Sequence, residues 1–261
     1  MKALAARRHD RRAPVVLLLL ALLLTGALYA VLSPTSADAA PAAATADEVE
    51  TGEKLFQANC ATCHGPDATG TDVVPSLVGV GAAAVDFQVG TGRMPMQANG
   101  PQAPAKPAQF DEEQIAALAA YVAALGPGPA VPTAEQVDPA LGDPANGMAL
   151  FRTNCSMCHN AVGAGGALSQ GKWAPNLWET TPTHLYEAMA TGPQSMPVFN
   201  DATLTPDEKR DIIAYVDLQR ESPPGGLDLG SLGPVSEGLW AWVIGMGLLI
   251  GAAVWIGARS S

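Results

Sequence analysis

One six-residue phrase constrains this chain more than any other feature, because it occurs twice and uses every cysteine. Residues 59–64 read NCATCH and residues 154–159 read NCSMCH, and the chain has four cysteines in all. The residues from 52 to 64 align with those from 147 to 159 at a constant offset of 95. Further along the chain, at other offsets, PSL matches PNL, TGRMP matches TGPQSMP, and AAYV matches IAYV. The chain is therefore predicted to contain two homologous domains, here called repeat 1 (45–126) and repeat 2 (146–221).

The pattern C-x-x-C-H is typical of covalent haem attachment. Two thiols one helical turn apart can add to the two vinyl groups of a haem, and the adjacent histidine then faces the iron as its proximal ligand. A zinc site needs about four ligands, whereas each repeat offers one C-x-x-C and one adjacent histidine. A disulfide gives no reason for histidine to follow in both copies. The sequence thus predicts two covalently bound haem c groups, held by Cys60, Cys63, Cys155 and Cys158, with His64 and His159 as iron ligands.

The second iron ligand is expected to be a methionine in each repeat. Met94-Pro95 and Met196-Pro197 both follow a Thr-Gly pair. A thioether ligand raises the reduction potential and closes the iron to small molecules, which suits electron transfer better than catalysis. Met96 is an alternative to Met94, and His184 is an alternative ligand for the second haem, although a surface or propionate-contacting role is favoured for it.

Prolines and tryptophans are placed near the two haems by the same patterns. Pro75 and Pro175 are expected to offer their carbonyl oxygens to the other ring nitrogen of the proximal histidine. Trp173 and Trp178 either line the second haem pocket or pack in an ordinary core.

The periodicity of apolar residues predicts small, all-helical domains with long loops. Residues 111–125 and 205–219 show helical spacing with acidic first turns, and Thr205 is the expected N-cap of the second. No segment shows sustained alternation of apolar and polar residues. The Pro-rich residues 127–145 are predicted to form a semi-extended linker, and residues 222–237 a Pro/Gly-rich tether.

Both ends of the chain are strongly apolar. Residues 1–38 contain basic residues, an apolar stretch at 14–32 and an A-x-A-like site at Ala37-Asp38-Ala39, so a cleaved signal peptide and a retained anchor are both compatible. Residues 238–258 are predicted to be a transmembrane helix. The basic N-terminus is expected to stay in the cytoplasm, which puts the two repeats on the extracytoplasmic side of the cell membrane.

The region between the apolar ends is acidic. Residues 39–238 carry 23 acidic and 8 basic side chains. Such a surface repels nucleic acid, so no nucleic-acid partner is expected. It either docks onto a basic partner or serves only solubility.

Each repeat resembles a class I cytochrome c. The resemblance rests on C-x-x-C-H, the distal methionine, a Gly/Phe pair on the first helix and a tyrosine on the last; these residues are Gly52, Phe56 and Tyr121, and Gly147, Phe151 and Tyr215. The predicted fold class is therefore all-α, with two tandem class I cytochrome c domains, a C-terminal transmembrane helix and an N-terminal apolar anchor or signal segment.

The layout over residues 14–261 resembles the dihaem cytochrome c subunit of the actinobacterial menaquinol-cytochrome c reductase, the cytochrome bcc complex. The resemblance implies an electron-transfer subunit of a quinol-cytochrome c reductase, a translocase, with no catalytic site of its own. It implies a Rieske iron-sulfur subunit and a cytochrome b subunit as partners, and a cytochrome c oxidase as electron acceptor without a soluble cytochrome c. A dihaem subunit of an alcohol dehydrogenase or another oxidase remains an alternative. A dihaem peroxidase fits less well, because it needs an exchangeable iron site.

Overall fold

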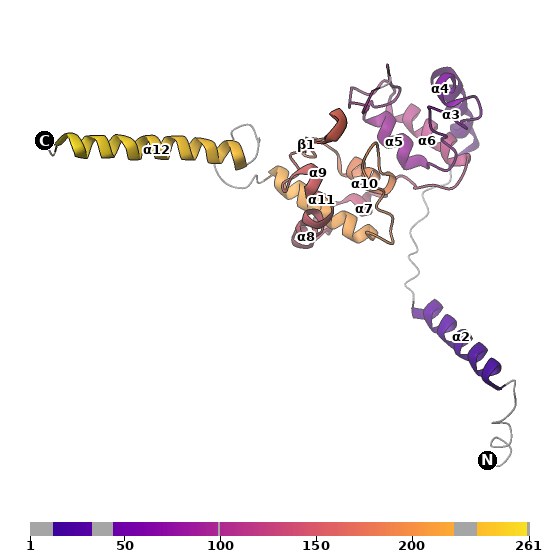
Figure 1. Cartoon of the computed structure of the whole chain (residues 1–261). Coiled ribbons are helices and arrows are strands. Elements are labelled where there is room, and N and C mark those ends of the chain that lie inside the picture. The colour runs from indigo at the N-terminus through magenta and orange to yellow at the C-terminus, as the bar shows by residue number, and fades with distance from the viewer. Residues whose placement is uncertain (1–12, 33–43, 99, 222–233, 260–261) are drawn as a thin grey trace, which may run out of the picture. The chain divides into compact units, whose positions relative to one another are not determined.

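The computed structural model describes residues 13–32, 44–98, 100–221 and 234–259 (Figure 1). The processing site expected at residues 37–39 and most of the predicted tether lie outside these ranges. The chain divides into an N-terminal unit, Met1–Ala42, and a second unit that contains everything after it.

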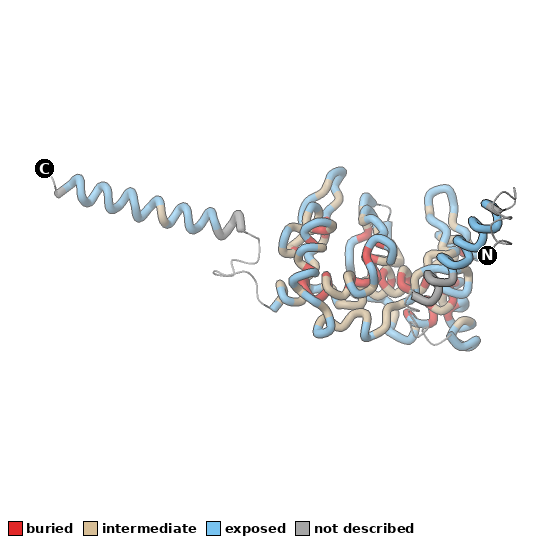
Figure 2. The backbone as a smooth tube through the Cα atoms, turned by 90° about the horizontal axis from the view of Figure 1, so that it is seen from below, coloured by how far each residue is buried: buried red, intermediate tan, exposed pale blue. Residues whose placement is uncertain are grey.

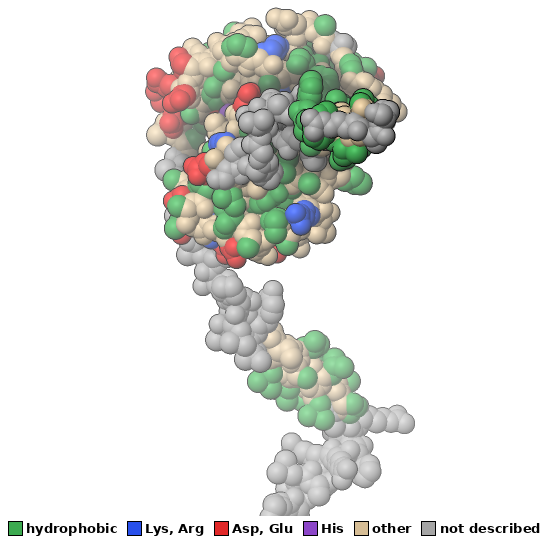
Figure 3. Space-filling view, turned by 90° about the vertical axis from the view of Figure 1, so that its left-hand side faces the viewer, with side chains coloured by type: hydrophobic (Ala, Val, Ile, Leu, Met, Phe, Trp, Pro, Cys, Tyr) green, Lys and Arg blue, Asp and Glu red, His purple; other side chains and the backbone are tan. Residues whose placement is uncertain are grey.

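The N-terminal unit contains helix α2 (Ala13–Leu32). Its strongly apolar part is Pro14–Gly26, and its large side chains from Val15 to Leu24 are exposed. Hydrophobic side chains cover the face of this helix that Figure 3 shows. An apolar helix with no polar face is what both a signal peptide and a membrane anchor require.

Repeat 1 is a small helical domain with its core between its first and last helices. Its elements are α3 (Ala46–Asn59), α4 (Ala61–His64), α5 (Ala82–Gly90) and α6 (Glu112–Ala124). Capping boxes at Thr45 and Asp111 start α3 and α6, because each side chain accepts from the third backbone N–H of its helix. Phe56, Leu118 and Val122 are at the centre of the buried core.

Repeat 2 follows the same plan with one addition. Its elements are α8 (Pro144–Asn154), α9 (Ser156–His159), β1 (Gly166–Ala167), η3 (Ser169–Gly171), β2 (Trp173–Ala174), α10 (Pro182–Thr191) and α11 (Pro206–Glu221). The antiparallel pair β1–β2 corrects the expectation of purely helical repeats. Two paired residues per strand are too few to leave an alternating pattern in the sequence. The fold class is otherwise confirmed, and Figure 2 shows the buried residues gathered inside the two repeats.

The first and last helices of each repeat touch at a glycine. A Cβ atom on Gly52 would overlap the carbonyl oxygen of Ala117, and one on Gly147 would overlap the carbonyl oxygen of Asp211. Next to each glycine an aromatic pair packs at a tilt, with ring centroids 5.2 Å apart for Phe56 and Tyr121. The corresponding pair in repeat 2 is separated by 5.3 Å. The contact implied by the resemblance is confirmed in both repeats.

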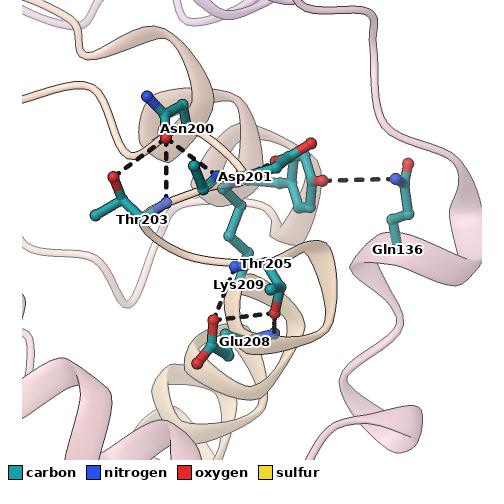
Figure 4. A network of polar contacts seen from close by, with 9 residues as sticks. Gln136, Asn200, Asp201, Thr203, Thr205, Glu208 and Lys209 are labelled. Atoms are coloured by element: carbon teal, nitrogen blue, oxygen red, sulfur yellow. Dashed lines mark hydrogen bonds and ion pairs between the residues drawn. The ribbon is translucent and has the colours of Figure 1, made fainter. Parts of the chain in front are cut away.

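Helix α11 begins in a network of polar side chains (Figure 4). Thr205 is the predicted N-cap, and it accepts from the backbone N–H of Glu208 while the Glu208 carboxylate accepts from Thr205. Lys209 is 1% exposed and is paired with Asp201. These contacts satisfy the free N–H groups of the helix start and a buried ammonium group together.

The linker at 127–145 is not semi-extended throughout, which corrects the prediction. It contains α7 (Ala134–Val137) and η2 (Pro139–Leu141). Thr133 caps α7, and Gln136 reaches the hydroxyl of Tyr186 in repeat 2 (Figure 4). The prolines suggested an extended chain, but capping side chains and contacts with repeat 2 fold it locally.

The second half of the linker leads directly into repeat 2, and the two repeats also touch each other. Helix α5 packs against α10 (Figure 1). The side chain of Gln102 accepts from the backbone N–H of Trp173 and donates to its carbonyl oxygen, both at 2.9 Å. The backbone N–H of Ala103 donates to the Gln194 side chain at 3.2 Å. Repeat 1 and repeat 2 therefore meet through helices and through loops.

Helix α12 (Pro234–Arg259) contains the predicted membrane segment. Gly238–Ala258 is the one described segment long and apolar enough to cross a membrane, with a mean hydropathy of 2.0 and none of it buried. The exposed colouring along α12 in Figure 2 agrees with this.

Candidate functional site

Each C-x-x-C-H phrase forms a short helical turn directly after the first helix of its repeat. In repeat 1 the backbone N–H of His64 donates to the carbonyl oxygen of Cys60 at 2.9 Å. His159 and Cys155 make the same bond at 2.9 Å in repeat 2. No disulfide joins the four cysteines, and each turn presents two thiols three residues apart with an imidazole directly after the second thiol.

The proximal histidines are oriented by proline carbonyl oxygens, as the sequence predicted. The Nδ1 atom of His64 lies 3.0 Å from the carbonyl oxygen of Pro75, and the Nδ1 atom of His159 lies 3.1 Å from that of Pro175. A carbonyl oxygen can only accept, so Nδ1 carries the proton and the lone pair is on Nε2. Each imidazole is thus fixed in the tautomer that ligates a metal through Nε2.

The loop that brings the proline to the histidine is the same in both repeats. The backbone N–H of Gly70 donates to the carbonyl oxygen of His64 at 2.8 Å, and Gly165 bonds to His159 in the same way at 2.9 Å. Both glycines have positive φ angles, 76° and 81°. A Cβ atom at either position would lie 2.5 Å from a backbone carbonyl oxygen of the returning loop. Only glycine fits there without moving the loop.

Burial differs between the two sets of thiols and imidazoles. Cys60 and Cys158 are half-buried, Cys63 is exposed and Cys155 is buried. Burial, with a smaller effect of Cys158, raises the pKa of the Cys155 thiol to about 12. Burial also lowers the pKa of His159, against the opposing effect of its bond to Pro175. The second site therefore holds a neutral thiol and a neutral imidazole at neutral pH.

The predicted distal methionines lie against the cores of their own repeats. Met94 packs on the core of repeat 1, and its backbone N–H donates to the Gln88 carbonyl oxygen at 2.9 Å. Met196 packs on the core of repeat 2. Met96 is half-buried outside the repeat 1 core. Met94 therefore contacts the core of repeat 1, whereas Met96 is not part of it.

The other side chains predicted near the second haem are two tryptophans, Trp173 and Trp178, and His184. The indole N–H of Trp178 donates to the Val162 carbonyl oxygen at 2.7 Å, so this side chain closes the loop after the second C-x-x-C-H turn. Trp173 is 41% exposed. His184 is packed against α5 of repeat 1, edge-on to Phe87 at 6.0 Å between ring centroids. Its ring is thus engaged by the other repeat, which argues against a role as haem ligand.

Sequence reasoning did not single out Gln102 and Gln194, which join the two repeats. Both are isolated glutamines in loops, and a long-range hydrogen bond of this kind leaves no local pattern in a sequence.

Comparisons with known proteins agree with the doubled site. The family model described as "Cytochrome C oxidase, cbb3-type, subunit III" matches residues 47–122 and 142–216. Proteins named "Cytochrome bc1 complex cytochrome c subunit" are similar over nearly the whole chain. The one from Mycobacterium tuberculosis is 49% identical, over 97% of this chain and 93% of that protein. The one from Corynebacterium diphtheriae is 45% identical, over 99% of both.

Among solved structures, a chain of the Kuenenia stuttgartiensis reducing HAO-like protein complex matches 64% of this chain and 94% of that chain. It is 17% identical, with a TM-score of 0.32, too low to inform the fold.

Proposed function

This chain belongs to the family of cytochrome c subunits of the cytochrome bc1 complex, and we propose that it transfers electrons within such a complex through two covalently bound haem c groups. Repeat 1 (45–126) and repeat 2 (146–221) each hold one haem. Each C-x-x-C-H turn supplies two thioether links and a proximal histidine, with Met94 and Met196 as the distal ligands. When bound, the haem iron supplies reversible one-electron exchange between its ferric and ferrous states.

The residues present fit this group. The four thiols are free to form thioethers, and addition of a thiol across a vinyl group places sulfur on one carbon and hydrogen on the other. The proline carbonyl oxygens hold Nδ1 of each histidine, which leaves Nε2 for the iron. A methionine packs on each core, and as the second iron ligand it would favour electron transfer over ligand exchange.

The observation that carries the proposal is the doubling of one set of bonds. The histidine-to-proline and glycine-to-histidine hydrogen bonds recur in both repeats at distances that differ by at most 0.1 Å. A third bond recurs as well, because the backbone N–H of Leu77 donates to Ala68 at 2.8 Å and that of Leu177 donates to Gly163 at 2.9 Å. A disulfide needs no oriented imidazole, and a structural zinc site needs about four ligands, whereas each turn offers two thiols and one imidazole. Two haems in one chain suit a protein that relays electrons between two larger partners.

We propose that these partners are a Rieske iron-sulfur centre as donor and the copper centre of a cytochrome oxidase as acceptor, beside a cytochrome b subunit that oxidises quinol. Support comes from the names of the relatives and from α12, which is long and apolar enough to cross a membrane. Tethering raises the effective concentration of each haem near a partner that is also fixed in the membrane. The basic N-terminus supports an extracytoplasmic position for the haem domains.

The acidic surface of the haem domains would be attracted to a basic surface on a partner protein. Acidic side chains are more numerous than basic ones on the face in Figure 3. Attraction to a basic partner surface acts over a screening length of about 8 Å at physiological salt, so it guides local docking more than long-range capture.

The test is purification of the tagged full-length chain from membranes, followed by oxygen uptake in washed membranes. The proposal expects Rieske and cytochrome b subunits in the purified complex, and quinol oxidation by oxygen without added soluble cytochrome c. Deleting residues 238–261 should abolish uptake while both haems keep their spectra. Co-purification of an alcohol dehydrogenase instead, or unchanged uptake with normal levels of the truncated protein, would contradict it.

A further inference from the structure

Three side chains that commonly ligate metals meet where repeat 1 touches repeat 2. Asp86 comes from α5, and His184 and Glu187 come from α10, where a spacing of three residues puts them on one helix face. One ligand atom from each side chain lies within 4.8 Å of the other two. Helices α5 and α10 both precede the Thr-Gly pair of their repeat, so the cluster joins equivalent helices of the two domains.

The partner of the Glu187 carboxyl group among the described residues is another carboxyl group, that of Asp86. The residue is 0% exposed, and neither of its carboxyl oxygens meets a hydrogen-bond donor in the described part of the chain. The group that acts on it most strongly is a second carboxyl, Asp86, and burial with Asp86 raises the pKa of Glu187 to about 10. Buried carboxyls are normally satisfied by donors, by a charge or by a metal, because desolvation is otherwise uncompensated.

The nearby cations are engaged elsewhere. Arg93 lies over the Phe87 ring, 4.8 Å from its centroid. Lys209, on the α11 helix that packs against α10, is paired with Asp201. Within the described residues, no basic side chain pairs with Glu187.

The geometry of His184 and Asp86 suits a bridging cation. The Nε2 atom of His184 lies 3.8 Å from Oδ2 of Asp86, too far for a direct hydrogen bond. Two ligand atoms that share a cation at about 2.1 Å each lie between about 3.4 and 4.2 Å apart. The three ligand atoms lie within 4.8 Å of one another, so the carboxylates move closer together when they bind a cation.

The histidine ring is held in place, and the site is open to solvent at one side. Phe87 packs edge-on against the ring, and the bare Gly90 leaves space for Nε2, since a Cβ there would lie 3.1 Å from it. The side chains of His184 and Asp86 are 20% and 25% exposed. A cation can therefore enter from solvent while Glu187 stays buried.

We propose that Asp86, His184 and Glu187 form a binding site for a divalent cation, with Zn²⁺ as the best match, that cross-links the two repeats. One imidazole and two carboxylates are a ligand set that zinc accepts, with solvent water in the fourth position. The two negative charges of the ionised carboxylates cancel the charge of the cation, so the buried cluster becomes neutral. The site is separate from both C-x-x-C-H turns, and the inference does not depend on the proposed electron-transfer partners.

Binding exchanges a proton for the cation. The neutral Glu187 carboxyl releases its proton to solvent as its oxygen bonds to the metal, so affinity should rise with pH. The cation adds a further link between the repeats to the hydrogen bonds that Gln102 makes with Trp173 and Ala103 makes with Gln194.

The test is calorimetric titration of zinc chloride into the full-length, haem-bearing protein in detergent after dialysis against EDTA. The proposal expects one Zn²⁺ per chain and release of roughly one proton, measured in buffers of different ionisation enthalpy. Glu187→Gln keeps the shape of the side chain and should weaken binding by more than about 100-fold, as should His184→Gln. Glu179→Gln, the same change at an exposed position, should leave binding unaltered.

Two outcomes would overturn the proposal. If the wild-type protein binds no Zn²⁺, then Glu187 keeps its proton and packs as a neutral acid. If Zn²⁺ binds equally well to Glu187→Gln and His184→Gln, the cation is held elsewhere on the chain. Unchanged haem spectra in both variants confirm that each remains folded.

Discussion

Repeat 1 and repeat 2 hold the same site on cores of different composition. Repeat 1 buries five alanines, which are Ala68, Ala83, Ala103, Ala117 and Ala119. Repeat 2 buries two, and fills its interior with larger side chains, namely Phe151, Tyr186, Met189, Phe199 and Tyr215. The histidine-to-proline distances nevertheless agree within 0.1 Å. The motif and its return loop define the site, while the rest of the core is free to vary.

The difference in side-chain size bears on how far each repeat depends on its haem. Burial of apolar surface contributes about 25 cal/mol per Å², so larger buried side chains give repeat 2 more stability from protein alone. Repeat 1 needs the apolar haem ring to complete a comparable core. We therefore expect repeat 1 to depend more strongly on haem attachment than repeat 2.

The largest effect is expected from removal of the thiols. Replacing Cys60 and Cys63 by serine, or Cys155 and Cys158 by serine, should each halve the covalently bound haem. Because its own core is smaller, repeat 1 should become protease-sensitive in the first variant, while repeat 2 should keep more of its helix in the second. Haem-stained gels and limited proteolysis measure both. Faster digestion of haem-free repeat 2 would reverse the comparison.

The second-largest effect is expected from replacing the distal ligands. The repeats differ here, because repeat 1 has two candidate methionines and repeat 2 has one. Met94→Ala and Met196→Ala should each remove the sulfur-to-iron near-infrared band of one haem and lower its reduction potential. Met96→Ala is the matched control and should change neither. A full near-infrared band in Met94→Ala would move the assignment to Met96.

The helix crossings should respond alike in the two repeats. Gly52→Ala and Gly147→Ala each place a Cβ against a backbone carbonyl oxygen, and such overpacking costs about 1–3 kcal/mol of unfolding free energy. Gly100→Ala, in an exposed loop with no atom closer than 3.7 Å, is the control. Thermal unfolding followed by circular dichroism gives the result. An effect in only one repeat would show that the crossings are not equivalent.

The last comparison concerns a position where the repeats differ in chemistry, Glu187 in α10 against Phe87 in α5. The pKa of Glu187 is raised from the ordinary 4.5 to about 10 by burial. An acid with a raised pKa favours the folded state at low pH, and this advantage is lost as pH rises from 4.5 toward 10. In EDTA, the melting temperature of the wild type should therefore fall relative to Glu187→Gln over that range. Parallel pH profiles would contradict the assignment of a buried, protonated carboxyl.

Much of the site could be predicted because its determinants are local. The C-x-x-C-H turns, the proline acceptors and the cap at Thr205 each rest on residues close in sequence, and the structure confirms the turns, both proline contacts and the cap. The duplication helped further, since each feature found in one repeat could be checked in the other. The haem and its iron ligands remain predictions.

The features that sequence reasoning missed depend on tertiary contacts. The β1–β2 pair is too short to show a period, and the folded linker is held by contacts with repeat 2 that proline content does not reveal. The meeting of Asp86 with Glu187 joins residues 101 positions apart in sequence. No local sequence pattern encodes such a pairing, so only the packing of α5 against α10 in the structure reveals it.

The central claim, that each repeat carries one covalent haem, is tested most directly by mass spectrometry of the membrane-purified chain. After acid-acetone extraction, the intact mass should exceed that of the polypeptide by two haems. After proteolysis, the peptides containing Cys60–His64 and Cys155–His159 should each retain one. A polypeptide mass without haem, or an unmodified C-x-x-C-H peptide from either repeat, would contradict the account.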